Sequence, residues 1–258
     1  MVDVIDLKPD AVSGCEIGQM KINAVLFDMF DTLMMIERDH AFYSPSLRQA
    51  YLFVRERGVK TTFREFEKAY VKARDALYAE ADAKMEEPHF NLRIANALTQ
   101  LGYSYPVSSD VVIGATNAFC EAFMKYVRVD EAAIASLKQL HGKYKLGIVS
   151  NFAIPECVTK LLNEHGLTEL FDVIIVSGAI NKRKPSPEIY KKALNVLGVC
   201  AQNAVFVGDT ADADIAGPKS VGMRTVYIER RAQEMPKDAC PDQTIKTMSD
   251  LLPALERC

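Results

Sequence analysis

The chain has 258 residues, of which 49% are hydrophobic, and it carries a formal net charge of −3 at pH 7 with a pI of about 5.9. A chain of this length and hydrophobicity can bury a substantial core, so we expect a globular protein. It has no basic excess to neutralise a nucleic-acid backbone or an anionic membrane surface, which excludes both as expected partners.

The start of the chain and its cysteines indicate a cytoplasmic protein. No apolar run reaches the ~18 residues of a membrane-spanning helix, and no charged start followed by an apolar stretch resembles a targeting signal. The six cysteines are scattered, without a CxxC pair or a histidine at zinc-ligand spacing. We interpret them as free thiols, which are typical of a reducing compartment.

Helical periodicity dominates the first half of the chain. Residues 1–22 show no clear period, and we interpret them as an N-terminal extension whose role the sequence does not reveal. A first buried strand is predicted over 24–27. Apolar residues then recur about every three to four positions, which predicts amphipathic helices over 44–57, 63–84, 92–101 and 109–127. We predict an all-helical inserted domain over 38–118.

The second half alternates between strand and helix. Strands are predicted over 145–149, 172–176, 204–207 and 225–228, and helices over 155–165, 187–197 and 212–221. Strands that alternate with helices form βαβ crossovers, so the fold class is α/β with a doubly wound parallel sheet. The strand over 24–27 would join that sheet. The predicted core domain therefore comprises 23–37 and 119–258, and the helical domain caps it.

Polar residues follow the predicted strands at the edge where open parallel sheets bind ligands. They are Asp28, Asp31 and Thr32 after the first strand, Ser150 and Asn151 after the second, Lys184 after the third, and Asp209, Thr210 and Asp214 after the fourth. Taken singly, each has a structural explanation as a turn residue, a helix cap or a solvated charge. Together they would bring carboxylates, a hydroxyl and an ammonium to one crevice, which suits phosphate chemistry.

In this order the residues resemble the four motifs of the haloacid dehalogenase-like (HAD) hydrolase superfamily, in its type-one capped form. The resemblance runs from residue 24 to about 252, includes the segments 215–223 and 241–245, and implies a Rossmann-like core with the cap inserted after the first strand. It places Asp28 at the nucleophile, Ser150 at the second-motif hydroxyl, Lys184 at the third-motif lysine, and Asp209 with Asp214 at the acidic fourth motif.

The resemblance implies Mg²⁺ as cofactor and an aspartyl-phosphate on Asp28. A carboxylate beside Mg²⁺ and a lysine can attack phosphorus and divide one difficult displacement into two. Mg²⁺ prefers hard oxygen ligands, which Asp28, Asp209 and, by resemblance, the backbone carbonyl of Phe30 would supply. Asp214 would orient water or Lys184 from behind these ligands.

The remaining polar residues at the strand ends are expected to hold the substrate. Ser150 and the backbone around Asn151 would bind phosphoryl oxygens, and Thr32 and Thr210 are further candidate substrate-binding residues. Lys184 would offset the charge that develops on those oxygens in the transition state. The expected partner is a small phosphorylated molecule, and we expect a monomer or a homodimer.

Phe30 departs from the pattern of the family's phosphatases. The second residue after their nucleophile is an aspartate, which protonates the leaving alcohol and then activates water. General acid–base assistance is commonly worth ~10² to 10⁴ in rate, so a phenylalanine predicts a slow phosphatase. Asp31, a cap residue or the substrate could supply the proton, and acyl or aryl phosphates need it least.

Two other functions fit the same residues. An aromatic residue at position 30 resembles the 2-haloacid dehalogenases, whose nucleophile attacks carbon and expels halide. Asn151 and Tyr190 suit that branch, but its fourth motif usually carries serine and asparagine where this chain has Asp209 and Thr210, and it needs no metal. A catalytically weak member that binds a phospho-ligand or a protein is the second alternative. A phosphonate-cleaving relative would need a cap lysine, and none stands out.

The cap is expected to decide specificity by closing over the crevice and excluding water. Its arginines could clamp an acidic substrate, although a solvated helix face is the simpler interpretation; they are Arg48, Arg55, Arg74 and Arg93. Its aromatic residues are expected to form its own core; they are Tyr43, Tyr51, Phe53, Phe63, Phe66 and Tyr70.

Overall fold

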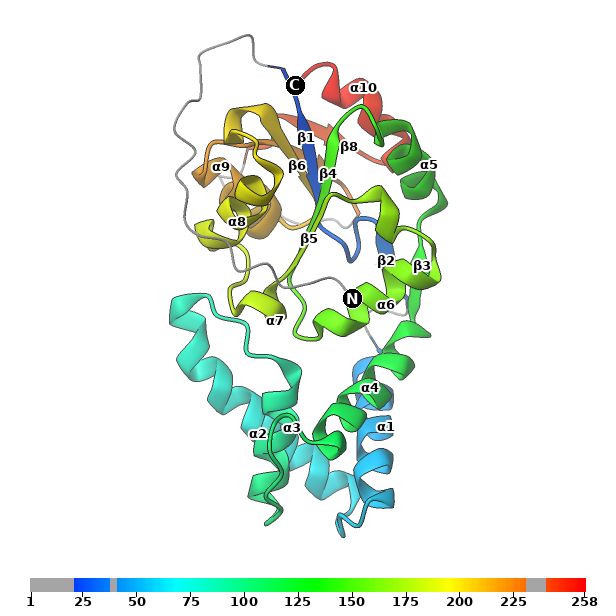
Figure 1. The fold of residues 1–258 in the computed structure, drawn as a ribbon, viewed down its shortest axis with the longest axis vertical. Coiled ribbons are helices and arrows are strands. Elements are labelled where there is room, and N and C mark those ends of the chain that lie inside the picture. The colour runs from blue at the N-terminus through cyan, green and yellow to red at the C-terminus, as the bar shows by residue number, and fades with distance from the viewer. Residues whose placement is uncertain (1–20, 38–40, 231–239) are drawn as a thin grey trace.

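A parallel sheet forms the centre of the molecule, and a block of helices projects from one end of it (Figure 1). The computed structural model describes residues 21–37, 41–230 and 240–258, so the predicted extension 1–22 lies almost wholly outside the described residues. The sheet has the order β5-β4-β1-β6-β7-β8. Its strands are β1 (Ala24–Phe27), β4 (Lys145–Ser150), β5 (Val173–Val176), β6 (Ala204–Gly208), β7 (Arg224–Ile228) and β8 (Gln243–Ile245).

Every pairing in this sheet is parallel, and helices cover both of its faces. Alternate residues of β1 point to opposite faces: Ala24 and Leu26 pack with α8 (Pro187–Leu197), and Val25 and Phe27 pack in the core that includes α5 (Glu131–Leu140) and α6 (Pro155–Glu164). A strand buried on both faces has to be apolar throughout, as β1 is. The predicted doubly wound α/β class is confirmed.

Short helices complete the core. They are η3 (Thr168–Leu170), α7 (Ser177–Ile180), η4 (Ala201–Asn203), η5 (Ala211–Ala216), α9 (Gly217–Ser220), η6 (Met248–Asp250) and α10 (Leu251–Leu255). The helix predicted over 212–221 is in fact two elements, because η5 is a π-helix that α9 continues. Strand β8 and helices α5 and α10 were not predicted from the sequence.

The insert after β1 is helical, as predicted. It contains α1 (Tyr43–Glu56), α2 (Phe63–Ala81), η2 (Asp82–Lys84), α3 (Phe90–Gln100) and α4 (Asp110–Met124). Helix α1 packs against α4 and α2 against α3, and aromatic side chains including Phe66 and Tyr70 are buried between them. Figure 1 shows this block beyond the carboxyl ends of the strands, where a cap would lie. The boundaries 38–118 stay a prediction, and α4 runs without a break through residue 118.

A two-stranded antiparallel ribbon joins the insert to the core. Its strands are β2 (Met34–Ile36) and β3 (Val127–Val129), on the two chain passages between core and cap. Asp31 turns the chain into β2 with a left-handed φ of 59°, and its Oδ1 accepts a hydrogen bond of 3.1 Å from the backbone N–H of Ile36. Three-residue strands are too short to leave a readable period in the sequence.

The cap rests on the core through the segment 82–90. The backbone N–H of Phe90 donates to the carbonyl of Ala153 over 2.9 Å, just after β4. On the other side, Arg183 donates its backbone N–H to the carbonyl of Met85 over 2.9 Å, and its guanidinium lies 2.7 Å from Asp82. One cap segment thus contacts both core loops that carry predicted site residues, the loop after Ser150 and the loop before Lys184.

The described residues contain no helix long and apolar enough to cross a membrane. Cys120, Cys157, Cys240 and Cys258 are free thiols, whereas Cys200 is disulfide-bonded. The expectation that all cysteines are free is therefore wrong for Cys200.

Candidate active site

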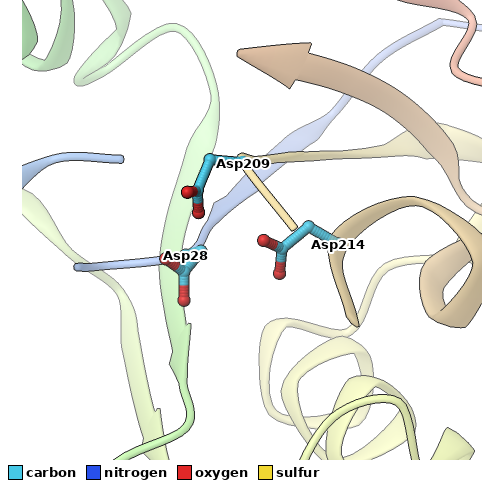
Figure 2. Close-up of side chains that lie close together, drawn as sticks. All are labelled: Asp28, Asp209 and Asp214. Carbon is cyan, nitrogen blue, oxygen red and sulfur yellow. The ribbon is translucent and has the colours of Figure 1, made fainter. Parts of the chain in front are cut away.

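Three carboxylates meet at the carboxyl ends of β1 and β6. Phe27 of β1 lies opposite Val207 of β6, so Asp28 and Asp209 each follow their strand at nearly the same level. Figure 2 shows the side chains of Asp28, Asp209 and Asp214 turned toward one another, with Asp214 on the turn of η5. Each offers an oxygen within 4.8 Å of the others.

Lys184 holds two of these carboxylates. Its Nζ lies 2.6 Å from Asp28 Oδ1 and 2.7 Å from Asp214 Oδ1, although the three residues are far apart in the sequence. Lys184 is only 4% exposed and Asp28 only 8%. Burial alone would lower the pKa of Lys184, but the charges of Asp214 and Asp28 outweigh it and raise that pKa. The ammonium is thus held charged, with one oxygen of each carboxylate.

The cluster has more negative than positive charge, and the pKa of Asp209 shows the effect. Burial first, and then the charges of Asp28 and Asp214, raise the pKa of Asp209 from 3.8 to about 7. Burial also raises the pKa of Asp214, although Lys184 opposes the change. A cation placed among these oxygens would relieve the repulsion that adds to the effect of burial on both pKa values.

Glycine is required at 208 for Asp214 to reach the site. A Cβ at Gly208 would lie 2.4 Å from Cγ of Asp214, which no side chain could tolerate. The backbone N–H of Thr210 donates to Asp214 Oδ2 over 2.9 Å, and the hydroxyl of Tyr190 donates to the carbonyl of Ala213 within η5. Two hydrogen bonds thus hold the π-helical turn, and π-turns are frequent at functional sites.

The predicted hydroxyl groups differ in their burial. Ser150 ends β4 next to β1 and is fully buried, and Thr32 is also buried. Neither hydroxyl oxygen has a hydrogen-bond partner among the described residues. A buried polar atom without a partner is unusual and is explained when a ligand completes it. Thr210 is more exposed, and its hydroxyl donates to Asp209 over 3.4 Å.

The side chain of Asn151 contacts the main chain of Lys184. Its side-chain amide donates to the backbone carbonyl of Lys184 over 2.9 Å and accepts from the backbone N–H of Lys184 over 2.7 Å. The side chain therefore fixes the lysine's main chain, and only the backbone of Asn151 is left to face a substrate. The sequence gives no signal for this pairing, because the two residues lie on different loops.

A family model described as haloacid dehalogenase-like hydrolase matches residues 22–222. The chain belongs to this family. Residues 22–222 include all four motif positions, so the family resemblance that the motif order indicated is confirmed. The protein is therefore a hydrolase of the HAD superfamily.

Relatives of this HAD-like hydrolase include phosphatases. Glyceraldehyde 3-phosphate phosphatase from Methanopyrus kandleri is 31% identical over 242 residues, which cover 90% of this chain and 96% of that protein. Pyrophosphatase PpaX from Halalkalibacterium halodurans is 35% identical over 131 residues, which cover 50% of this chain and 60% of PpaX. The match thus spans less than two thirds of PpaX.

Solved structures of both reaction types share the fold. A 2-haloacid dehalogenase from Pseudomonas syringae pv. Tomato DC3000 superposes with a TM-score of 0.68 at 25% identity, covering 92% of this chain and 99% of that one. A HAD phosphatase from Thermococcus onnurineus gives a TM-score of 0.61 at 25% identity, covering 91% of this chain and 98% of the other. These likenesses establish the family, and the chemistry of the site has to distinguish the reactions.

Phe30 of this HAD-like hydrolase is packed in an aromatic cluster. Its ring centroid lies 4.9 Å from that of Phe152 and 5.5 Å from that of Phe123 on α4. The neighbouring Asp31 is 5% exposed, and its carboxylate is engaged with the turn before β2. Asp31 therefore has a structural task, which argues against its serving as the replacement for the missing acid.

Proposed function

We propose that this HAD-like hydrolase is a Mg²⁺-dependent phosphatase that forms an aspartyl-phosphate on Asp28. The observation that carries the proposal is the buried Lys184–Asp28 contact of 2.6 Å beside a cluster of three carboxylates. A nucleophilic carboxylate needs its charge held in place and a nearby cation to receive the phosphoryl oxygens. The phosphatases among its relatives support the same reaction class.

The donor set fits Mg²⁺. Asp28 and Asp209 offer carboxylate oxygens. The carbonyl of Phe30 accepts no hydrogen bond from a described residue, because the backbone N–H groups of the turn after β1 donate to the carbonyls of Met29 and Met34 instead. Hard oxygen donors of this kind suit Mg²⁺, and no thiolate or imidazole belongs to the set. Asp214 would stay outside, since one of its oxygens holds Lys184 and the other accepts from the backbone N–H of Thr210. When bound, Mg²⁺ would neutralise charge on the phosphoryl group and so favour attack by an anion.

The residues of the chain then account for two displacements. In the first, an oxygen of Asp28 forms a bond to phosphorus while the bond from phosphorus to the leaving-group oxygen breaks, and that oxygen takes the electron pair. In the second, water attacks the phosphorus, the bond to Asp28 breaks with its electron pair returning to the carboxylate, and phosphate is released while a proton of the water passes to the solvent. Lys184 and the hydroxyl of Ser150 would hold the phosphoryl oxygens in both steps.

Phe30 limits which substrates react quickly. Because its side chain has no proton to give, the leaving group departs as an anion or takes a proton from water or from its own structure. Acyl and aryl phosphates, whose leaving groups are stable anions, are therefore the favoured substrates. We also propose a cytoplasmic location and a monomer or homodimer, as the sequence predicted.

One observation favours a second candidate function. An aromatic ring at position 30, together with the structural likeness to a 2-haloacid dehalogenase, suits attack of Asp28 on carbon with loss of halide, which needs no general acid. The carboxylates of Asp209 and Asp214 argue against the dehalogenase. They repel each other, and a reaction without a metal gains nothing from holding them close together.

A parallel assay separates the candidates. The protein is incubated with acetyl phosphate, p-nitrophenyl phosphate or 2-chloropropionate, each with Mg²⁺ and with EDTA, and the release of phosphate, nitrophenol or chloride is followed. Phosphate release that EDTA abolishes supports the phosphatase. Chloride release that EDTA does not change supports the dehalogenase, and no release from any compound favours a binding protein. Asp28→Asn is the matched inactive variant in every arm.

A further inference from the structure

A pocket lies between the cap and the core beside the candidate active site. Its volume is about 210 Å³, and it is lined by cap residues of α1, α2, α3 and α4 and by the core segment 151–154. Asn151 belongs to both places, because it lines the pocket and its amide holds the main chain of Lys184. Phe152 also lines the pocket, and its ring packs on Phe30, two residues after Asp28. The pocket therefore adjoins the candidate active site through Asn151 and Phe152.

Most of the wall is aromatic. Phe42, Phe90, Phe119 and Phe152 line the cavity, and Phe90 and Phe119 have ring centroids 4.5 Å apart. Rings arranged in this way bind another flat ring by stacking and edge contacts. An engineered cavity of about 150 Å³ accommodates benzene. The pocket thus has room for one six-membered ring with a small substituent.

A buried arginine supplies the polar end of the pocket. Arg93 of α3 is 7% exposed, and its Nη2 donates to Glu87 over 3.0 Å and to the hydroxyl of Tyr78. Its Nε has no hydrogen-bond partner among the described residues. A buried donor without a partner carries a desolvation cost that a ligand acceptor would remove. Arg93 is buried, whereas Arg48 and Arg55 are exposed on α1.

The charge balance of the pocket decides which acceptor fits. Glu87 is 7% exposed and already neutralises Arg93. A carboxylate entering the pocket would add a second buried anion beside Glu87 without a second cation to pair with it. A neutral acceptor, such as a carbonyl or nitro oxygen, meets the Arg93 guanidinium without that penalty.

We propose that this pocket binds the leaving group of the substrate and selects an uncharged aromatic group of one ring, with a hydrogen-bond acceptor directed to Arg93. The inference rests on the proposed function, since it assigns the substrate class of the same site: an aryl phosphate whose phenol carries a neutral polar substituent. This class also agrees with Phe30, because a phenolate departs without a general acid.

Binding of the phenol product tests the pocket without any turnover. Calorimetry measures the affinity of the full chain for para-hydroxyacetophenone, which has a neutral acceptor, and for para-hydroxybenzoate, which has a carboxylate. We expect the neutral phenol to bind about tenfold more tightly or better, since the benzoate would bury a second anion beside Glu87 without a cation to pair with it. Equal binding, stronger binding of the benzoate, or no binding of either phenol would overturn the proposal.

Two variants locate the binding at Arg93. Arg93→Met removes the donor but leaves Glu87 buried without its cation, so the double variant Arg93→Met/Glu87→Gln keeps the charge balance and preserves folding. We expect either folded variant to lose about tenfold in affinity for para-hydroxyacetophenone. Arg48→Met, on the exposed face of the cap, is the matched control and is expected to bind like the unmodified protein. Unchanged affinity in the double variant would overturn the proposal.

Turnover separates this inference from the proposed function. The ratio of kcat/KM for the phosphate ester of para-hydroxyacetophenone to kcat/KM for acetyl phosphate is expected to fall about tenfold in the double variant. An unchanged ratio overturns the pocket assignment while the phosphatase proposal stands. Arg93-dependent binding of the phenol without hydrolysis of any phosphate supports the pocket and refutes the phosphatase.

Discussion

The substitution Phe30→Asp tests whether a missing general acid limits this HAD-like hydrolase. A carboxyl group would then stand two residues after Asp28, where neighbouring carboxylates raise its pKa and keep part of it protonated. We expect kcat/KM for a simple alkyl phosphate to rise about 10²-fold, the lower end of the ~10² to 10⁴ that general acid catalysis gives. Acetyl phosphate should change by less than about threefold, because its leaving group needs little protonation.

The structure also sets the stability cost of that substitution. The Phe30 ring contacts Phe123 at 5.5 Å and Phe152 at 4.9 Å between centroids. Two such pairs are worth about 1 to 3 kcal/mol beyond burial, and loss of a half-buried ring adds about 1 kcal/mol. A total of about 2 to 4 kcal/mol is within the ~5 to 15 kcal/mol stability of a typical domain, so the variant should fold.

Phe30→Ala is the matched control, because it loses the same ring contacts without gaining an acid. Steady-state rates with Mg²⁺ are measured for an alkyl phosphate and for acetyl phosphate, and urea unfolding measures stability. We expect kcat/KM for the alkyl phosphate to be higher in Phe30→Asp than in Phe30→Ala, and kcat/KM for acetyl phosphate to be similar in the two variants. Equal rates for the two variants would refute it and would show that another group already supplies the proton.

The other predictions concern residues around Asp28. Lys184→Met should abolish measurable turnover and lower the free energy of unfolding in urea by about 3 to 5 kcal/mol, because it leaves buried carboxylates unpaired. Adding Asp214→Asn should recover stability but not activity. Full stability in Lys184→Met alone would contradict the prediction. Asn151→Ala should lower kcat about tenfold, because two buried backbone groups of Lys184 lose their partner, while the Mg²⁺ concentration that gives half-maximal activity stays unchanged. An unchanged kcat would show that the Asn151 side chain is not needed to position Lys184. For Asp209, the raised pKa of about 7 means that its contribution to metal-free stability is greatest below pH 3.8 and is lost as pH rises through 7. In EDTA, the melting temperature relative to Asp209→Asn should therefore fall between pH 4 and pH 8, and Mg²⁺ should reverse the fall; a difference independent of pH would contradict the prediction.

The sheet was predictable from the sequence because its signals are local. The run that ends at Phe27 is apolar at every position, which a strand covered on both faces requires, and Asp28 marks its end. The motif order then placed Ser150, Lys184 and Asp209 correctly relative to the strands. The three-residue strands β2 and β3 were missed, since their pairing is a contact between Ile36 and Val127 that no local period reveals.

The finer geometry of the site depends on contacts between distant segments. The backbone around Asn151 was predicted to bind phosphoryl oxygens, but nothing in the sequence indicated that its side-chain amide bonds the main chain of Lys184, from which it is separated by a whole βα unit. The Arg93–Glu87 pair in the pocket was likewise invisible, because a charged residue on an amphipathic helix usually faces water. The π-turn of η5 was predicted as an ordinary helix, because helical spacing does not distinguish the two.

Capture of the covalent intermediate tests the central claim most directly. The protein is mixed with Mg²⁺ and acetyl phosphate, quenched in acid within a turnover, digested and mapped by mass spectrometry, with Asp28→Asn in parallel. Our account predicts a phosphoryl group on Asp28 that disappears as phosphate is released and is absent from the variant. Phosphate release with Asp28 unmodified throughout, or turnover that persists in Asp28→Asn, would contradict it.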